Sequence, residues 1–361
     1  INVGRTMSQK YLVVVTNPPY MNSSYMPTNL KVYIKNNYPQ FKNDMFSAFT
    51  NKAVSMAVEN GHIGLLMPYV WMFISSYEKM RNFINKNVTI TSLVQLEYNA
   101  FEAACVPVAA LTMCKNSLHF SGEYVKLSEF RGADNQGSKT LEAVNNPDCG
   151  YRYTAKQDIY SKIPGSPIAY WVGDRFIQNL EIGKPIKKIA RARSGAKTGK
   201  NELFLKLWWE VPLPELFLDC RSYNSCVDSE KTWFPYNKGG DAQNWYGNRE
   251  LVVDFYGGGK HIKEYSEKNG TSIDLNAKDV FFKRGITWTA LTSSRNTFRF
   301  SPYGAAFDSN KGPMVFPEDE DQLYYLLALF ISPVAQYYFK VFNPTISLQN
   351  GDVDNLPVIM D

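Results

Sequence analysis

Apolar runs alternate with amphipathic stretches in the first third of the chain. Residues 11–15 (Tyr-Leu-Val-Val-Val) form a short apolar run, typical of a buried parallel strand. Apolar positions spaced three and four residues apart predict a helix from Asp44 to about Glu59. The pattern then predicts further strands and one further helix, namely strands at 61–68, 90–96 and 106–113 and a helix at 75–86. This order indicates an α/β fold built on a sheet.

The periodicity weakens over residues 115–165, which are rich in Gly, Asn, Asp and Ser. We predict a domain boundary here, with a first domain of residues 1–155 and a second of residues 156–361. Strand-like pieces in the second domain are short and separated by Gly, Pro or Asn turns. An apolar helical pattern at 323–342, interrupted near Pro333, follows a cluster of acids.

The tetrapeptide Asn17-Pro18-Pro19-Tyr20 follows the first apolar run. Its two prolines fix two φ angles and remove two backbone donors, so the loop is stiff and rich in acceptors. Asn17 adds an amide oxygen and Tyr20 a flat ring, which together suit an aromatic base that carries an amine. In open α/β sheets, ligands bind beyond the carboxyl ends of the strands, where this loop lies. The alternative interpretation is an ordinary Asn-Pro turn or a proline-rich linker.

Several motifs in order resemble those of the amino-methyltransferases that act on adenine N6. Asn17–Tyr20 matches their catalytic loop, and the later motifs are similar at 44–49, 61–68, at Phe101 and at 106–113. The second half resembles the recognition regions of large bacterial enzymes, through residues 198–204 and 343–357. These enzymes include the PglX-type methyltransferases of phage-exclusion systems and single-chain restriction–modification enzymes.

The resemblance implies a partial doubly wound, Rossmann-like methyltransferase sheet followed by a mixed α+β target-recognition domain. It implies that Asn17 and the Pro18 carbonyl accept hydrogen bonds from the adenine amine, that Pro19 stiffens the loop and that Tyr20 stacks on the flipped base. Phe101 resembles a second aromatic wall, with a core or loop anchor as the alternative. Phe46 is expected in the core.

The same resemblance implies S-adenosylmethionine (SAM) as cofactor. In this family order, the glycine-rich SAM loop and its acidic partner lie upstream of the catalytic loop. Only 16 residues precede Asn17, so we expect an incomplete SAM site that an upstream part of the same polypeptide completes. The run Val252–Gly259 has an acid and three glycines, but the wrong spacing for this loop, and is predicted to be a turn of the recognition region.

The net charge is +5, and the basic residues are unevenly distributed. Residues 184–200 hold seven Lys or Arg and no acid, which suits contact with the phosphates of double-stranded DNA. A plain solvated face is the alternative. Gly195 and Gly199 would let the backbone approach a phosphate. The candidate DNA-binding residues are Lys197, Thr198, Lys200, Asn201, Lys283, Arg284 and Arg295; nearby Trp288 is expected in the core.

Other classes of site are disfavoured. The chain has no apolar run of 18 residues and no charged-then-apolar amino-terminal signal, so no membrane partner is expected and the predicted location is cytoplasmic. The five cysteines and three histidines lack zinc-site spacing, so no metal is predicted.

Three hypotheses follow for function. The first is site-specific DNA adenine-N6 methylation in a restriction–modification or phage-defence system, with further defence subunits as partners and this chain as a fragment inactive by itself. The alternative is a DNA-binding specificity module without activity of its own. The weaker third is methylation of another planar amine, such as a glutamine side chain or an RNA base.

Overall fold

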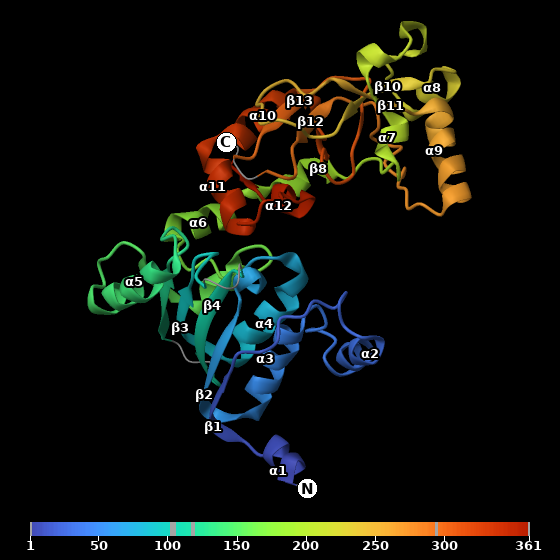
Figure 1. Cartoon of the computed structure of the whole chain (residues 1–361). Helices are drawn as coiled ribbons and strands as arrows, with labels where there is room; N and C mark the ends of the chain where they lie inside the picture. Colours follow the sequence, from blue (N-terminus) through green and yellow to red (C-terminus); the bar gives the residue numbers. More distant parts are fainter. Residues whose placement is uncertain (1, 102–105, 117–119, 293–294, 360–361) are drawn as a thin grey trace. The chain divides into compact units, whose positions relative to one another are not determined.

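The computed structural model describes residues 2–101, 106–116, 120–292 and 295–359, and divides into two compact units (Figure 1). Unit 1 comprises residues 1–181 and unit 2 residues 182–361.

Unit 1 is built on a six-stranded mixed sheet in the order β1-β2-β4-β3-β5-β6. β1 runs parallel to β2 and β3 parallel to β5, whereas β4 is antiparallel to both of its neighbours. β6 closes the far edge as an antiparallel partner of β5. The strands are β1 (Tyr11–Thr16), β2 (Ala57–Pro68), β3 (Thr89–Gln95), β4 (Val108–Cys114), β5 (Ser121–Lys126) and β6 (Arg152–Lys156).

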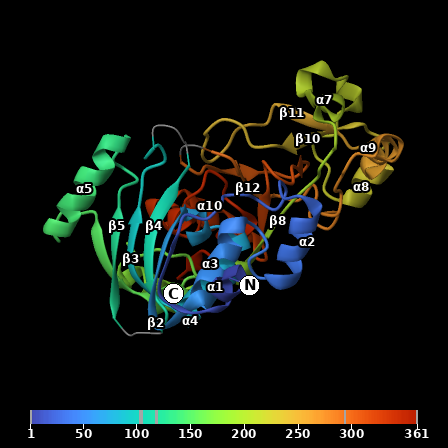
Figure 2. The same ribbon diagram turned by 60° about the horizontal axis from the view of Figure 1, so that its bottom comes forward.

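Helices α3 and α4 lie together on one face of this sheet (Figures 1 and 2). Phe46 and Ala53 of α3 and Met80 and Ile84 of α4 are buried in one core with the inward side chains of the sheet, such as Met67. This burial explains why the amphipathic patterns predicted both helices correctly. The helices of unit 1 are α1 (Asn2–Ser8), α2 (Thr28–Asn37), α3 (Met45–Met56), α4 (Glu78–Asn87), α5 (Ala133–Asn145) and α6 (Asp174–Ile182), whose last residue opens unit 2.

β1 is parallel, as predicted, but the prediction that it is buried is wrong. Leu12 and Val15 are each 74% exposed and Val13 is 58% exposed. The reason is its position: among the described residues β1 pairs only with β2, so one edge of the strand has no neighbouring strand. A doubly wound sheet is covered on both faces, whereas α3 and α4 cover one. β1 is therefore an edge strand with an exposed apolar surface.

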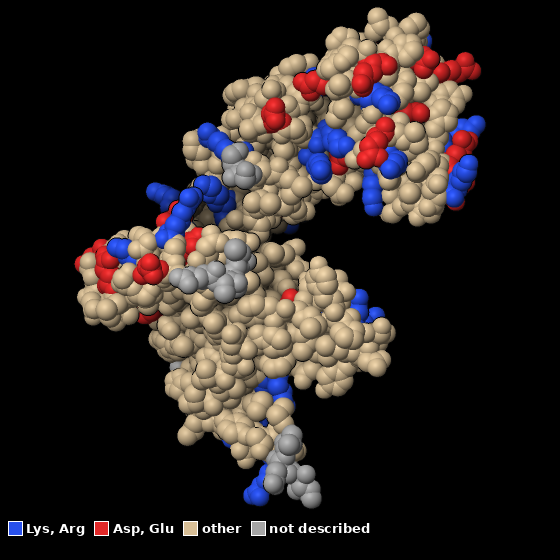
Figure 3. All heavy atoms as spheres, viewed as in Figure 1, with Lys and Arg blue, Asp and Glu red and all other residues tan. Residues whose placement is uncertain are grey.

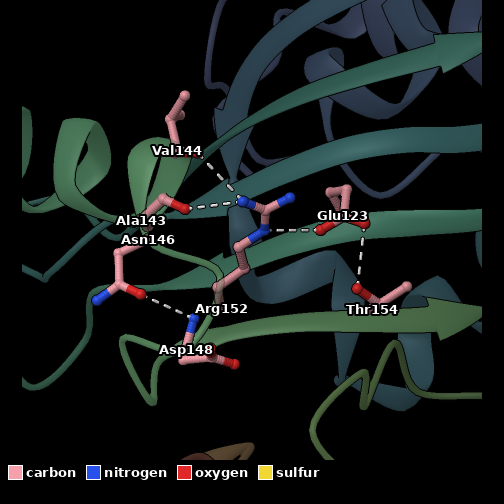
Figure 4. A network of polar contacts seen from close by, with 7 residues as sticks. All are labelled: Glu123, Ala143, Val144, Asn146, Asp148, Arg152 and Thr154. Carbon is pink, nitrogen blue, oxygen red and sulfur yellow. Dashed lines mark hydrogen bonds and ion pairs between the residues drawn. The ribbon is translucent and has the colours of Figure 1, made fainter.

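A helix and a polar network occupy the region of weak periodicity. α5 is held at its carboxyl end by Arg152 of β6, whose guanidinium donates to the carbonyl oxygens of Ala143 at 2.9 Å and Val144 at 3.3 Å (Figure 4). The same guanidinium donates to Glu123 of β5 at 2.8 Å. A cation suits a helix carboxyl terminus, whose last carbonyls lack helical partners. The network joins α5 to the edge of the sheet.

Residues 156–181, which we predicted as the start of the second domain, lie within unit 1. Tyr160 and Tyr170 are buried and contact Tyr124 of β5, with the Tyr124 and Tyr170 rings stacked at 4.7 Å. The aromatic side chains of this segment complete the core of unit 1. The prediction missed this because the sequence of the segment is rich in turns and has no clear periodicity.

Unit 2 contains two four-stranded sheets, in the orders β14-β10-β11-β9 and β13-β12-β15-β8, and one strand pair, β16-β7. The short strands agree with the predicted pattern. They are β7 (Lys184–Pro185), β8 (Ala190–Arg193), β9 (Leu205–Leu207), β10 (Trp233–Asn237), β11 (Leu251–Asp254), β12 (Gly285–Trp288), β13 (Phe298–Ser301), β14 (Ala306–Phe307), β15 (Met314–Pro317) and β16 (Pro357–Val358).

The predicted interruption near Pro333 is confirmed. Ser332 ends one helix and caps the next, accepting the amide of Ala335 at 3.2 Å. Phe330 and Phe339, one from each helix, pack against Phe298 of β13. The helices of unit 2 are α7 (Asn201–Phe204), α8 (Tyr223–Asp228), α9 (Tyr256–Asn269), α10 (Leu323–Ile331), α11 (Pro333–Phe342) and α12 (Asn350–Asp354).

Across the described part of the chain, no single helix has the length and apolar composition needed to cross a membrane; only the pair Glu320–Ile331 and α11, bent by 70°, meets both conditions together.

Candidate functional site

The loop Asn17–Tyr20 follows β1 and lies beside the carboxyl-terminal end of β2, because the two strands are parallel. The Tyr20 hydroxyl lies 3.0 Å from Asn17 Oδ1 and 3.1 Å from the carbonyl oxygen of Leu66, and these two acceptors share its proton. The first contact joins the two ends of the loop, and the second holds it against β2. The structure therefore brings together the two side chains that the motif singled out.

The loop is anchored at Pro18 and accessible elsewhere. Pro18 is buried, whereas Asn17, Pro19 and Tyr20 are exposed. Tyr20 keeps 38% of its surface exposed, and partial burial raises the pKa of its phenol above the usual value. The phenol is thus a neutral donor at physiological pH. Because an amide oxygen has two lone pairs, Asn17 Oδ1 can accept a second hydrogen bond while it accepts that of Tyr20.

Asp44 positions the chain that follows the loop, a role that sequence reasoning missed. Its carboxylate accepts the amides of Met21 at 3.0 Å and of Phe46 at 3.3 Å, so it caps α3 and holds the residue after Tyr20. Burial raises the pKa of Asp44, against the effect of these hydrogen bonds. The signal available in the sequence was an Asp directly before the helical pattern.

The two other aromatic residues lie in different environments. Phe101 is 43% exposed, directly before residues 102–105, which lie outside the described residues. In the described part of the chain no contact joins Phe101 to Tyr20, so its place beside a base stays a prediction. Phe46 is buried beside Tyr77, with ring centroids 5.5 Å apart, which confirms it as a core residue.

In unit 2, Lys197, Thr198 and Asn201 line one cavity of about 200 Å³. The Thr198 hydroxyl is buried and donates to Asn201 Oδ1 at 2.8 Å, so Thr198 shapes the turn from inside. Lys238 and Lys311 line the same cavity, and sequence reasoning missed both. Each of these lysines has neutral residues on both sides in the sequence and directly precedes a glycine. The Lys-Gly pair is the sequence signal that would have identified them.

The basic stretch 184–200 does not form one continuous basic face. Lys200 pairs with Glu202 at 2.8 Å, and Arg193 forms a bidentate ion pair with Asp279 at 2.7 and 2.8 Å. Figure 3 shows blue and red side chains interspersed over unit 2. The stretch therefore contributes individual cations. One of them, the Lys197 ammonium, is accessible, and its one hydrogen bond within the described part of the chain goes to the Ser272 hydroxyl at 3.1 Å.

The remaining basic candidates do not line this cavity. Arg284 pairs with Glu320 at 2.5 Å, and Arg295 donates to the Ile331 carbonyl oxygen at 3.3 Å. Lys283 is exposed. Trp288 is fully buried and donates to the Leu348 carbonyl oxygen at 3.2 Å, which confirms it as a core residue.

Three glycines of unit 2 stand where close packing inside the protein leaves no room for a side chain. A Cβ on Gly258 would lie 2.4 Å from the Tyr223 hydroxyl oxygen, and one on Gly259 would lie 2.8 Å from Leu275 Cδ1. The run at 252–259 thus covers the end of β11 and the start of α9, where Gly257–Gly259 have positive φ and Gly258 and Gly259 pack against the protein's own side chains. Gly195 is likewise buried, with the Phe307 carbonyl oxygen 2.0 Å from where a Cβ would stand, so it does not face a phosphate as we expected.

Among the residues that the structure describes, no three His, Cys, Asp or Glu side chains are arranged to hold a metal ion.

Comparison with known proteins places these residues in context. Residues 2–101 match the family described as Eco57I restriction-modification methylase. The chain is 34% identical to the adenine-specific methyltransferase PglX of Lacticaseibacillus casei (strain Zhang) over 99% of this chain and 30% of that protein. The resemblance to PglX-type adenine-specific methyltransferases is confirmed. The adenine-specific methyltransferase BrxX of Escherichia coli O9:H4 (strain HS) is 31% identical over 98% of this chain and 28% of its own length.

The chain thus spans less than a third of the length of these PglX-type relatives. The fold is similar to that of the type IIL restriction-modification enzyme MmeI, solved in complex with DNA, with a TM-score of 0.58 and 11% identity over 94% of this chain and 44% of that one. This likeness confirms the expected fold class.

Proposed function

We propose that this chain supplies the catalytic loop and the DNA-recognition region of a site-specific DNA adenine-N6 methyltransferase acting in restriction–modification or phage defence. The observation that carries the proposal is the Asn17–Tyr20 pair, held at 3.0 Å at the carboxyl-terminal edge of the sheet. The names of the PglX-type relatives support adenine as the substrate.

Asn17 and the Pro18 carbonyl orient the amine of an adenine flipped out of the duplex. An amine that donates both protons to fixed acceptors directs its lone pair away from the ring, where it can act as a nucleophile. Asn17 Oδ1 retains one lone pair for this purpose, and its contact with Tyr20 holds its direction. The nitrogen becomes cationic and strongly acidic on gaining a methyl group, so it releases one proton to water and the site needs no strong base.

Tyr20 provides the surface on which the base rests. Its hydroxyl contacts with Asn17 and Leu66 fix the ring, and its exposed area is available to a flipped base. Stacking of this kind contributes about 1–3 kcal/mol, which is comparable to the cost of extruding a base.

The described residues do not form a complete SAM site, since the glycine run at 252–259 is filled by Tyr223 and Leu275. When bound, SAM would supply the methyl group. We propose that a further part of a longer polypeptide carries the SAM loop and packs on the exposed side of β1. Leu12, Val13 and Val15 present there an apolar edge that a neighbouring strand and helix would bury.

Unit 2 is the proposed DNA-recognition region, on the basis of the lysines that share the cavity beside Asn201. The same feature favours the second candidate function, a specificity module that binds duplex DNA without methylating it. The two candidate functions differ in the role of Asn17, which only the methyltransferase requires for activity.

Modified-base sequencing of DNA from cells that express the full-length protein tests the proposal. Wild type should place N6-methyladenine at one short motif, and Asn17→Ala should reduce this methylation by about 100-fold or more, the scale of a positioned catalytic hydrogen bond. The matched control is Asn87→Ala, an exposed asparagine at the end of α4. The 361-residue chain expressed by itself should leave DNA unmodified.

Asn17→Asp, which keeps an acceptor oxygen, should retain part of the activity. Methylation that is insensitive to Asn17→Ala would overturn the catalytic assignment. DNA binding without methylation by the wild-type full-length protein would favour the specificity module.

A further inference from the structure

Three cavities of unit 2 adjoin one another through shared lining residues, and we refer to them together as the groove. The first, of about 430 Å³, is lined by Leu348–Gly351 and by Ser309 and Asn310. The second, of about 200 Å³, shares Ser309 and Asn310 with it and adds Lys238 and Lys311. The third, of about 410 Å³, shares these two lysines. The turn Asp308–Lys311 therefore runs along the whole groove.

Asp308 builds this turn from within the protein. Its Oδ1 accepts the amides of Asn310 and Lys311, both at 2.8 Å, and its Oδ2 accepts the hydroxyl of Tyr236 at 3.2 Å. The carboxylate is only 8% exposed, so its acceptors are used internally. Its backbone amide donates to Asn237 at 2.8 Å, which ties the turn to β10. The backbone of the turn is thus fixed, whereas the side chains of Asn310 and Lys311 are exposed.

Two glycines allow the neighbouring loop to pack directly against the turn. A Cβ on Gly239 would lie 2.5 Å from the Lys311 carbonyl oxygen, and one on Gly312 would lie 2.5 Å from the Asn237 carbonyl oxygen. This close approach sets Lys238 beside Lys311. Binding groups on such a rigid frame lose little conformational entropy when they engage a ligand.

Three side chains on this frame, those of Asn310, Lys311 and Lys238, form no hydrogen bond or ion pair with the residues that the structure describes. Asn310 and Lys311 are also exposed. The two lysines also repel each other, and burial lowers the pKa of Lys238 although Asp308 acts in the opposite direction. A phosphate between them would relieve the repulsion. An amide with free donor and acceptor is the group that reads adenine in the major groove.

We propose that Asn310 reads a base edge of the target duplex and that Lys238 and Lys311 bind the adjoining phosphates. This proposal rests on the proposed function, of which it identifies the specificity determinant. The separation of roles follows from chemistry: a phosphate contact adds affinity for any sequence, whereas a base contact adds affinity for one.

The full-length protein carrying Asn310→Ala tests the reading role by modified-base sequencing. We expect methylation to persist while one position of the recognition motif becomes relaxed, with discrimination there falling about 10- to 100-fold. Asn269→Ala, an exposed asparagine at the end of α9, is the matched control and should leave the motif intact. Asn310→Gln, which keeps the amide, should shift the preference rather than abolish it. An unchanged motif in both Asn310 variants would overturn the reading role.

Lys238→Gln and Lys311→Gln test the phosphate role in duplex binding by the 361-residue chain over 50–200 mM salt. Each should lower the slope of log affinity against log salt by about 0.9 on any duplex sequence, whereas Lys268→Gln on α9 should not. Unchanged slopes would overturn the phosphate role. These experiments distinguish the two proposals. If the wild-type protein does not methylate DNA, the salt slopes still decide whether the groove binds phosphates. If the recognition motif does not change in the Asn310 variants, the Asn17 variants still decide the proposed function.

Discussion

The two candidate sites are assembled in different ways. The catalytic loop consists of four consecutive residues, and its main contact, Tyr20 to Asn17, spans three positions. The groove of unit 2 combines segments near residues 197, 238, 310 and 349, which are distant in sequence. A local motif can be read directly from the sequence, whereas a site made by packing cannot.

The difference extends to charge. Several basic residues that stand out in the sequence are neutralised by nearby acids, such as Lys200 by Glu202 and Arg284 by Glu320. Lys238 and Lys311, which do not stand out, have no ion-pair partner in the described part of the chain. A cluster of charge in sequence therefore says less about a binding surface than the number of cations left unpaired by the fold.

Substitution at Tyr20 tests whether the catalytic loop works as a local unit. Tyr20→Ala removes the stacking surface and should reduce methylation by the full-length protein by about 100-fold, at the upper end of the stacking free energy. Tyr20→Phe keeps the ring but loses the contacts to Asn17 and Leu66, and should cost about tenfold. The measurement is single-turnover methylation of a duplex that contains the target motif. Equal losses in both variants would mean that the hydroxyl contacts, rather than the ring, dominate.

Two glycine substitutions contrast packed and open positions in the two units. Gly195→Ala forces a Cβ against the Phe307 carbonyl and should destabilise unit 2 by about 1–3 kcal/mol. Gly137→Ala lies within α5 with open space around it, and should stabilise unit 1 by about 0.5–1 kcal/mol. Urea unfolding measured by tryptophan fluorescence gives both values. A neutral Gly195→Ala would return this glycine to the role of admitting a phosphate.

Much of unit 1 could be predicted because its signals are local. Apolar positions at helical spacing predicted α3, and the apolar runs predicted β2, β3 and β4. The burial of β1 could not be predicted correctly, since Val13 and Val15 have the composition of core residues but lie at an edge. The domain boundary also depended on packing: Tyr160 and Tyr170 return to the first core through tertiary contacts that no periodicity announces.

The candidate site divides in the same way. Asn17 and Tyr20 could be singled out because the contact between them lies within four consecutive residues, whereas the contact of Tyr20 with Leu66 depends on the pairing of β1 with β2. Thr198, predicted to contact DNA, lines the groove, and its hydroxyl donates to Asn201 Oδ1; its contact with DNA stays a prediction. Asn310 was missed because its significance comes from Asp308, which fixes the turn, and from loops brought alongside by tertiary structure.

The smallest expected effect is the difference between Lys197 and Lys200 in the salt dependence of duplex binding. Lys197→Ala should lower the salt slope of duplex binding by about 0.9, which corresponds to an about threefold smaller loss of affinity between 50 and 200 mM salt. The reason is that the Lys197 ammonium is accessible and, among the described residues, bonded to a hydroxyl rather than to an acid. Lys200→Ala should have a smaller effect, since Glu202 already pairs with it at 2.8 Å and raises its pKa. Glu202→Gln, which frees Lys200, should raise the slope. Equal slopes for the Lys197 and Lys200 variants would show that the Lys200–Glu202 ion pair breaks when DNA binds. Ion pairs in the free protein would then be a poor guide to which cations contact phosphates.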